Sequence, residues 1–362
     1  MRELVSVIIP AYNAAHFIDT ALCSVRAQDW PVEAIVVNDG STDDLAGALR
    51  PHAGRVTVID QENRGLSAAR NAGLRRAAGR YVLFLDADDM LGPGVVAGQV
   101  AALEAAGGTG VPVCRTRFFS GLDAQGEPEP CGQWRRFPER LDIHVCHFNV
   151  APPLAFLVRR DVALEAGGFD ETLGACEDHD FWLRVQGVGH APFPGAEATV
   201  WYRRHAGSMS ANLERQWRHD MEMHQRIARL VEAGAPGFAD ARGTRLLACC
   251  AGMLLTATRL GLPEAAPLLP WLERLFWLAA RASVPGQGGA ETLFRYFLAR
   301  CRGLSFKVAD IFPETLAGVV ADGIATCLEM ADCAEWRCLD ATAMADKAAS
   351  MGEALYLGAA AN

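Results

Sequence analysis

Three carboxylates follow an apolar run in "VLFLDADDML", residues 82–91: Asp86, Asp88 and Asp89. Packed acids repel one another, and each is costly to desolvate without a cation or a hydrogen-bond donor beside it. The spacing of Asp86 and Asp88 lets both side chains reach one point from a turn. Carboxylate oxygens suit Mg²⁺ or Mn²⁺, which proteins hold with one or two carboxylates plus substrate phosphates. The pattern therefore favours a divalent cation that binds together with a diphosphate.

Two other interpretations of this acidic segment can be compared with the cation site. Residues 92–97 formally fit the dinucleotide pattern G-x-G-x-x-A, but Pro93 stands inside the turn and no acidic residue follows at the expected distance. Alternatively, Asp88 or Asp89 is simply the N-cap of a helix that runs from Gly94 onward. The short acidic motif alone does not separate the N-cap from the cation site.

A second acidic cluster precedes the apolar residues 181–183. Glu177, Asp178 and Asp180 fall in the first turn of a predicted helix. Carboxylates there are favoured by the helix dipole and by capping, so a structural role is one interpretation. A carboxylate in a reactive site can also take a proton from an attacking hydroxyl group. Both interpretations stay open from the residues alone.

Predicted strands and helices alternate in the first half of the chain, and these elements must position the acids. Short apolar runs predict strands at 4–9, 34–37, 56–59 and 81–85, and helical patterns lie between them at 17–27, 44–50 and 66–78. Continuous apolar strands separated by helices indicate a mostly parallel sheet covered on both faces. Ligands bind beyond the carboxyl ends of such strands, which is where Asp86 and Asp88 stand.

The second part of the chain has a different pattern of apolar residues. Helical patterns without strand signals predict an α/β domain over residues 1–211 and an all-α domain over residues 212–362. Amphipathic segments such as "LLPWLERLFWLAARA" are expected to form a helical core. Acceptor docking, homo-oligomerisation and peripheral membrane contact are the alternatives for these helices, although interfacial helices are usually more basic on their polar face.

Composition excludes several classes of protein. The 362 residues carry a formal net charge of −9, which argues against a dedicated nucleic-acid binder. The 11 cysteines include no C-x-x-C pair, which is typical of a reducing compartment. The first apolar run ends at Pro10, too early for a signal peptide, and the run 246–260 is too short to span a bilayer. We expect a cytoplasmic protein, with contact at the inner face of the membrane as the alternative.

Several motifs, taken in their order along the chain, resemble those of a known family. The chain reads "VSVIIPAYNAAHF", "IVVNDGSTDD", "ENRGLSAARNAGLRRAAGRYVLFLDADD", "EAGGFDETLGACEDHDFWLRV" and "WYRRHAGSMS". Together these segments resemble glycosyltransferase family 2, the inverting enzymes of the GT-A fold, over residues 4–210. The resemblance implies a Rossmann-like N-terminal domain that binds a nucleotide-sugar. One position departs from the family pattern, since Asn38 stands where the pair before Gly40 is usually Asp-Asp.

The resemblance also implies a role for each matching residue of the donor site. Tyr12 would stack on the base, Asp39 would accept a hydrogen bond from a base N–H, and Asp86 would contact the ribose or the metal. Asp88 and His205 would be ligands of Mn²⁺ or Mg²⁺, and Arg203 or Arg204 would meet phosphate oxygens. The remaining residues implied for the nucleotide pocket are Pro10, Ala11, Asn63 and Arg70.

Asp178 matches the family position of the general base, with Glu177 and Asp180 as the alternatives. An inverting transfer needs one carboxylate on the face of the sugar opposite the leaving diphosphate. No second acid is needed where a metal ion stabilises that leaving group.

The function implied is metal-dependent transfer of a sugar from a nucleotide-diphosphate donor, UDP-linked by preference, to a hydroxyl group of a saccharide, a lipid-linked glycan or a protein. A sugar nucleotidyltransferase is one alternative, but it would need a glycine-rich basic loop after the first strand, where this chain has "PAYNAAHF". A non-catalytic nucleotide-sugar-binding protein is the other. The joint presence of Asp88, Asp178 and His205 argues against it.

Overall fold

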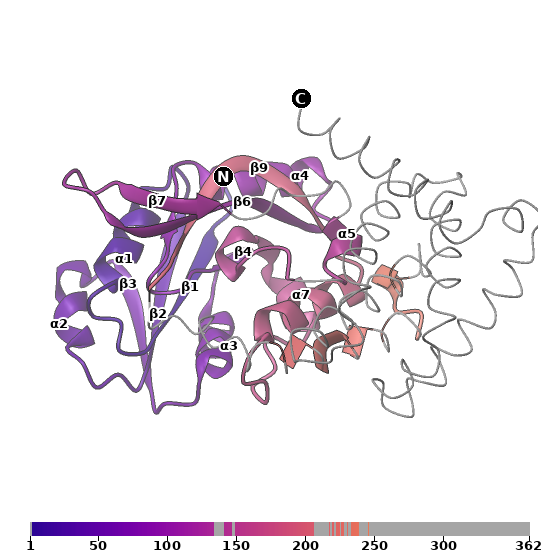
Figure 1. Cartoon of the computed structure of the whole chain (residues 1–362), viewed down its shortest axis with the longest axis horizontal. Helices are drawn as coiled ribbons and strands as arrows, with labels where there is room; N and C mark the ends of the chain where they lie inside the picture. The colour runs from indigo at the N-terminus through magenta and orange to yellow at the C-terminus, as the bar shows by residue number, and fades with distance from the viewer. Residues whose placement is uncertain are drawn as a thin grey trace, which may run out of the picture. The chain divides into compact units, whose positions relative to one another are not determined.

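The computed structural model describes residues 2–133, 141–146 and 149–205, with scattered positions between 217 and 245. The chain divides into two compact units, Met1–His219 with Ala233–Ala239, and Asp220–Glu232 with Asp240–Asn362. The first unit contains both sheets (Figure 1). The predicted all-α domain of residues 212–362 lies almost wholly outside the described residues. Its existence, its boundary and its role remain predictions.

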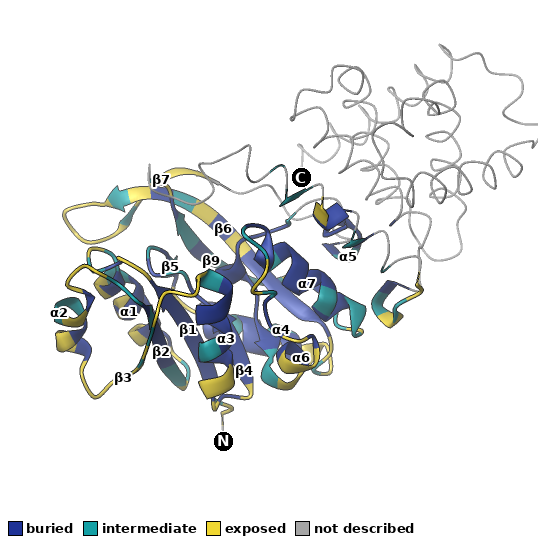
Figure 2. Cartoon of the chain, turned by 90° about the horizontal axis from the view of Figure 1, so that it is seen from below, coloured by how far each residue is buried: buried dark blue, intermediate teal, exposed yellow. Residues whose placement is uncertain are grey.

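A five-stranded sheet forms the centre of the first unit. Its order is β3-β2-β1-β4-β8, in which β1 to β4 run parallel and β8 pairs antiparallel with β4. The central strands β1 and β4 are continuous apolar segments buried on both faces (Figure 2), as the sequence predicts, whereas the edge strand β3 is partly exposed. The predicted strand ends are correct to within two residues; the observed strands are β1 (Val5–Ala11), β2 (Val32–Asp39), β3 (Val56–Gln61), β4 (Tyr81–Phe84) and β8 (Val158–Arg159).

The helices predicted between these strands are confirmed and are one or two residues shorter at their ends. They are α1 (Ile18–Arg26), α2 (Leu45–Leu49), which is followed by the 3₁₀ turn η1 (Arg50–His52), and α3 (Leu66–Arg76). α3 packs closely on β1, because a Cβ atom at Gly73 would lie 2.3 Å from Cγ2 of Ile8. The absence of a side chain at residue 73 therefore allows the helix to approach the sheet closely at this point.

A second, four-stranded sheet has no counterpart in the sequence prediction. Its order is β5-β9-β6-β7, with β6 and β9 parallel and the other two pairs antiparallel. The strands carry exposed charged residues and prolines, which conceal them in the sequence. They are β5 (Met90–Leu91), β6 (Val111–Leu122), β7 (Pro128–Gln133) and β9 (Pro192–Arg203).

The remaining helical elements pack around the two sheets. They are α4 (Val95–Ala105), α5 (Leu141–His144), η2 (Pro153–Ala155), α6 (Arg160–Glu165), α7 (Glu177–Gly187) and η4 (Pro236–Phe238). The N-cap interpretation of Asp88 and Asp89 is wrong, because β5 separates these acids from α4 and the N-cap residue is Gly94. Within the described ranges, no helix combines the length and apolar character that crossing a bilayer requires.

Gln99 of α4 ties three segments together inside the protein. Its side chain is fully buried, and Nε2 donates to the carbonyl oxygens of Pro112 in β6 (2.9 Å) and Ala155 in η2 (2.8 Å). Its Oε1 accepts from the backbone N–H of Ala196 in β9 at 3.2 Å. One amide therefore pairs with three backbone groups, of which the carbonyl oxygen of Pro112 also accepts from the N–H of Leu157 at 3.3 Å.

The substitution Gln99→Leu should lower the free energy of unfolding by about 2–4 kcal/mol, because it keeps the volume but removes the side-chain partner of the Ala155 carbonyl oxygen and of the Ala196 N–H. Chemical denaturation measures this change. The control Gln125→Leu removes an amide at an exposed turn and should change stability by less than about 0.5 kcal/mol. Equal stability of the two variants would contradict this role for Gln99.

Candidate functional site

The loops that follow β1, β2 and β3 are held together at one edge of the sheet. Oδ1 of Asn13 accepts from the backbone N–H of Thr42 at 2.8 Å, and the N–H of Asn13 donates to Oγ of Ser41 at 3.0 Å. Gly40 adopts φ +73°, and a Cβ there would lie 2.7 Å from the backbone N of Asn63. The neighbouring Tyr12 ring is 53 % exposed, which leaves its face open for stacking.

Asp39 organises the start of α3. Its carboxylate is 3 % exposed and accepts from Nε2 of Gln61 (2.7 Å), from the N–H of Arg64 (2.9 Å) and from the N–H of Gly65 (2.9 Å). The sequence did not indicate this structural role, and the predicted contact with a base N–H stays a prediction. Asn38 holds the adjacent turn, donating to Asp60 at 2.8 Å.

Arg70 joins the two acidic clusters. Its guanidinium is 1 % exposed, with Nη2 2.7 Å from Oδ1 of Asp86 and Nη1 2.8 Å from Oε1 of Glu177. Desolvation opposes its charge, but Asp86 and Glu177 outweigh that effect and raise the pKa of Arg70. Arg70 was predicted to line the nucleotide pocket. The structure buries its side chain as a bridge between the end of β4 and the first turn of α7, and a place in the wall of the nucleotide pocket stays a prediction.

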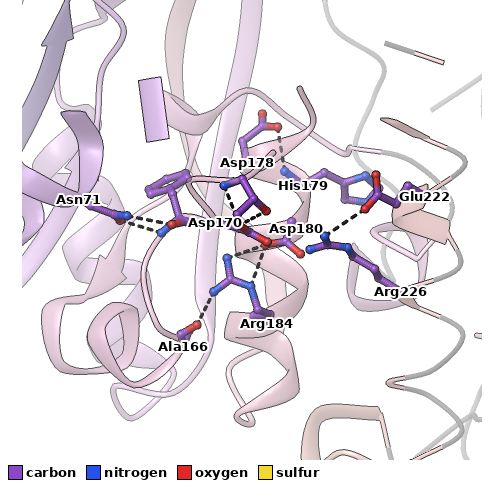
Figure 3. A network of polar contacts seen from close by, with 11 residues as sticks. Asn71, Ala166, Asp170, Asp178, His179, Asp180, Arg184, Glu222 and Arg226 are labelled. Carbon is purple, nitrogen blue, oxygen red and sulfur yellow. Dashed lines mark hydrogen bonds and ion pairs between the residues drawn. The ribbon is translucent and has the colours of Figure 1, made fainter. Parts of the chain in front are cut away.

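The three acids of α7 have different surroundings, and Figure 3 shows two of them, Asp178 and Asp180. Glu177 is paired with Arg70, and Asp180 is paired with Arg184 at 2.6 Å. Asp178 accepts from Nδ2 of Asn149 at 2.7 Å and from the N–H of His179 at 2.8 Å. Burial and the nearby charge of Glu177 raise the pKa of Asp178 to about 7. Asp178 is thus the acid whose proton affinity suits general base catalysis near neutral pH.

The end of β9 is attached to the turn that carries Asp88. Nε2 of His205 lies 2.9 Å from Oδ2 of Asp88, and both side chains are about one-third exposed (30 % and 28 %). Arg203 donates from Nε to the carbonyl oxygen of Asp88 at 2.8 Å, while its N–H donates to Oδ1 of the buried Asp89 at 2.7 Å. Burial and the charge of Asp86 raise the pKa of Asp88.

The two arginines near His205 have different surroundings. Arg203 is 7 % exposed, and its guanidinium packs against the ring of Phe119 at 4.2 Å, so it faces the protein interior rather than a phosphate. Arg204 is exposed and lies 4.0 Å from the ring centroid of Phe118. Of the two arginines proposed to meet phosphate oxygens, only Arg204 is accessible to one.

The predicted metal ligands are brought together in part. No group of three His, Cys, Asp or Glu side chains among the described residues is arranged to hold a metal ion. Asp88 and His205 form a pair, whereas Asp86 binds Arg70. One carboxylate and one imidazole suit Mn²⁺ or Mg²⁺ when substrate phosphates supply further ligands. A cation would also offset the unfavourable charge that raises the pKa of Asp88, so the residues fit the ion.

Two polar residues of this region were not singled out from the sequence. Asn149 donates to Asp178, and Asn71 of α3 binds the backbone of Phe169. Asn149 lies outside every motif, so no feature of the sequence indicated its contact with Asp178. Asn71 lies within the "ARNAG" segment of the third motif, but its partner is 98 positions away in the sequence.

Comparisons with known proteins agree with the motifs. The family model for glycosyl transferase family 2 matches residues 6–164. Glycosyltransferase GlyA of Streptococcus pneumoniae is 42 % identical over 93 residues, covering 25 % of this chain and 13 % of GlyA. The uncharacterized glycosyltransferase RP339 of Rickettsia prowazekii is 29 % identical over 187 residues, covering 50 % of this chain and 58 % of that protein. The chain thus spans less than two-thirds of either relative.

A likeness of fold is found among solved structures. Residues 1–349 of TarS from S. aureus superpose with a TM-score of 0.57 at 18 % identity, covering 91 % of this chain and 90 % of that one. The TarS fragment has also been solved in complex with UDP-GlcNAc and with UDP. The likeness supports an α/β GT-A-like fold with mixed sheets.

The raised pKa of Asp178 predicts a stabilising substitution. Because the folded protein binds this proton more tightly than the unfolded chain, ionisation of Asp178 lowers stability as pH rises from about 4 to about 7. Asp178→Asn removes this penalty and should stabilise the protein at pH 8 by up to about 4 kcal/mol. The difference in the free energy of unfolding between Asp178→Asn and the wild type should decrease as pH falls toward 4.

Unfolding by urea at several pH values measures this difference. The control Asp29→Asn changes a carboxylate whose side chain is 95 % exposed, and it should show little pH-dependent effect. A constant or inverted difference between Asp178→Asn and the wild type across this range would contradict the raised pKa.

Proposed function

Because residues 6–164 form a glycosyl transferase family 2 domain, we propose that the chain transfers a sugar from a nucleotide-diphosphate donor to an acceptor hydroxyl, with inversion at the anomeric carbon. The observation that carries this proposal is the Arg70 bridge. It connects Asp86 at the donor-side strand end with Glu177, the residue next to Asp178. A carboxylate suited to act as base is therefore fixed relative to the predicted donor site.

In the proposed reaction, Asp178 takes the proton of the acceptor hydroxyl as its oxygen attacks the anomeric carbon. The bond between that carbon and the diphosphate oxygen breaks, and the nucleoside diphosphate departs from the opposite face. With a pKa of about 7, a substantial fraction of Asp178 is ionised at neutral pH, and its basicity is greater than that of an ordinary aspartate. Asn149 and the N–H of His179 hold the carboxylate in place.

Glu177 and Asp180 are poorer candidates for the base. Glu177 is engaged by a fully buried guanidinium, and Asp180 is 4 % exposed and bound by Arg184. Neither carboxylate can take a proton without disrupting a buried ion pair, which is costly. The negative charge of Glu177 contributes instead by raising the proton affinity of Asp178.

The donor site is proposed at the edge formed by the loops after β1, β2 and β4. Tyr12 is exposed for base stacking, and Pro10, Ala11, Asp39 and Asn63 border the same edge. Asp88 and His205 would hold Mn²⁺ or Mg²⁺, with Asp86 as a further contact to the ion or the ribose. The ion, when bound, stabilises the negative charge that develops on the departing diphosphate. The TarS complexes with UDP and UDP-GlcNAc support UDP as the first nucleotide to test.

A thermal-shift screen of UDP, GDP, dTDP and CMP, each with and without Mn²⁺, tests the donor class. We expect a shift with UDP that depends on Mn²⁺, since a ligand at 100 times its dissociation constant stabilises a fold by about 2.7 kcal/mol. Asp88→Asn should weaken the Mn²⁺-dependent part, because it removes a ligand charge. An undiminished UDP shift without Mn²⁺, or in Asp88→Asn, would rule out this metal site.

Asp178→Asn should reduce turnover of UDP-GlcNAc by about 10²–10⁴-fold while leaving Mn²⁺-dependent UDP binding intact, because the substitution removes only the proton acceptor. Release of UDP measures turnover. Glu177→Gln is the matched variant: it keeps an acceptor for Arg70 but removes a negative charge. It should therefore lower the pKa of Asp178 and move the acid limb of the pH–rate profile to lower pH. Near-native turnover of Asp178→Asn would exclude Asp178 as the base.

A further inference from the structure

The contacts of α3 point to a positioning residue for the base. We propose that Asn71 holds the loop of residues 167–171 so that α7 presents Asp178 in its reactive position. This inference rests on the proposed function, in which Asp178 accepts the proton of the acceptor hydroxyl.

Asn71 binds the loop as a neighbouring strand would. Its Nδ2 donates to the carbonyl oxygen of Phe169 at 2.8 Å, and its Oδ1 accepts from the N–H of Phe169 at 2.8 Å. Nδ2 also donates to Oε1 of Glu171 at 3.0 Å. The side chain is 8 % exposed, and both ends of the amide are in use. A carboxamide offers the donor and the acceptor at the spacing that this pair of bonds requires; a carboxylate lacks the donor.

The loop backbone is shaped to receive this amide. Gly168 adopts φ +67°, a conformation that other residues rarely take. A Cβ atom at Gly168 would also lie 2.5 Å from Oδ1 of Asn71. The loop can therefore approach Asn71 closely only because residue 168 has no side chain.

The ring of Phe169 packs against α7 and so couples the position of the loop to that of the helix. Its ring stacks on Phe181 with centroids 4.3 Å apart and an interplanar angle of 21°, and it meets Phe84 of β4 edge-on at 4.8 Å. Phe181 lies three positions after Asp178 in the same helix. A shift of Phe169 would therefore move the turn of α7 that carries the base.

The preceding residue of α3 acts on the same turn. Arg70 binds Glu177 and lies 5.1 Å above the ring of Phe169. Consecutive residues of one helix thus hold the loop and the first turn of α7. The start of this helix is in turn fixed by Asp39 on the predicted nucleotide side. α3 therefore contacts both the predicted nucleotide side, through Asp39, and the helix that carries the base, through Arg70 and Asn71. It holds these two parts of the site in a fixed relative position.

The first test is Asn71→Ala, with Asn71→Ser as a milder variant. We expect faster amide hydrogen exchange in peptides covering residues 167–181, because Phe169 loses its partner. The kcat for UDP-GlcNAc should fall by about 30–100-fold, since small misplacements of a reacting group have effects of this size. The KM for UDP-GlcNAc and the Mn²⁺-dependent affinity for UDP should stay within about threefold, and the number of UDP sites per protein molecule should equal that of the wild type, which a loss of folded protein would not allow.

Glu171→Gln is the matched control. It keeps a hydrogen-bond acceptor for Asn71 and removes only the charge of a partly exposed ion pair with Arg64 at 3.1 Å. Such pairs contribute little, so exchange and kcat should stay within about twofold of the wild type.

Gly168→Ala tests the same contact from the loop side and should reproduce the loss of kcat. In the double variant Asn71→Ala with Gly168→Ala, the clash with Oδ1 is gone, so kcat should be no lower than in Gly168→Ala alone. Effects that multiply in the double variant would show that the two residues act independently and would overturn the proposal, as would a wild-type kcat in Asn71→Ala.

Asp178→Asn, assayed in parallel, separates this inference from the proposed function. An inactive Asp178→Asn beside an unimpaired Asn71→Ala would overturn the positioning role alone. An active Asp178→Asn would overturn the base assignment on which that role depends.

Discussion

The buried guanidinium of Arg70 is the interaction on which the rest of the site depends. It is the common partner of Asp86 and Glu177, which come from the end of β4 and from the start of α7. Removing one member of a buried, hydrogen-bonded ion pair typically costs about 3–5 kcal/mol, because the remaining charge is left without a partner. The bridge therefore allows the acidic segment after β4 to pack against a second acidic cluster, and it fixes the distance between them.

The bridge also separates the acids into groups with different chemistry. Glu177 has its charge compensated by Arg70, yet its negative charge still acts on Asp178, whose own direct partners are an amide and a backbone N–H. Burial and that neighbouring charge give Asp178 a proton affinity far above that of a solvated aspartate. Asp88 lies on the other side of the bridge, beside His205, where burial and Asp86 raise its pKa in a similar way. Binding of a proton would neutralise the buried charge of Asp178, and binding of a metal cation would compensate the charge of Asp88.

The sequence predicted the parallel sheet and its helices well, because continuous apolar runs separated by helical patterns leave few alternatives. It did not predict the second sheet, since β6 and β9 carry exposed arginines, glutamate and prolines that conceal the strand pattern. Nor did it indicate that Arg70 is buried between two carboxylates. An arginine within a helix carries no signal of burial, and its partners Asp86 and Glu177 meet only in the folded chain. The amides of Asn71 and Asn149 were missed for the same reason, because contacts of a side chain with a distant segment leave no local pattern.

The balance of charge gives a physical reason for a metal ion in the proposed function. Asp86, Glu177 and Asp178 stand around one buried guanidinium, and Asp88 lies close enough to Asp86 to feel its charge, so the site is negative when these acids are ionised. A nucleoside diphosphate is also an anion, and it would be repelled by this arrangement if it approached alone. A divalent cation between Asp88, His205 and the diphosphate would convert that repulsion into attraction. Arg70 cannot take over this role, since its guanidinium is already shared by two carboxylates and is almost fully buried. In the proposed function the cation would thus attract the donor to the site before it assists the departure of the diphosphate.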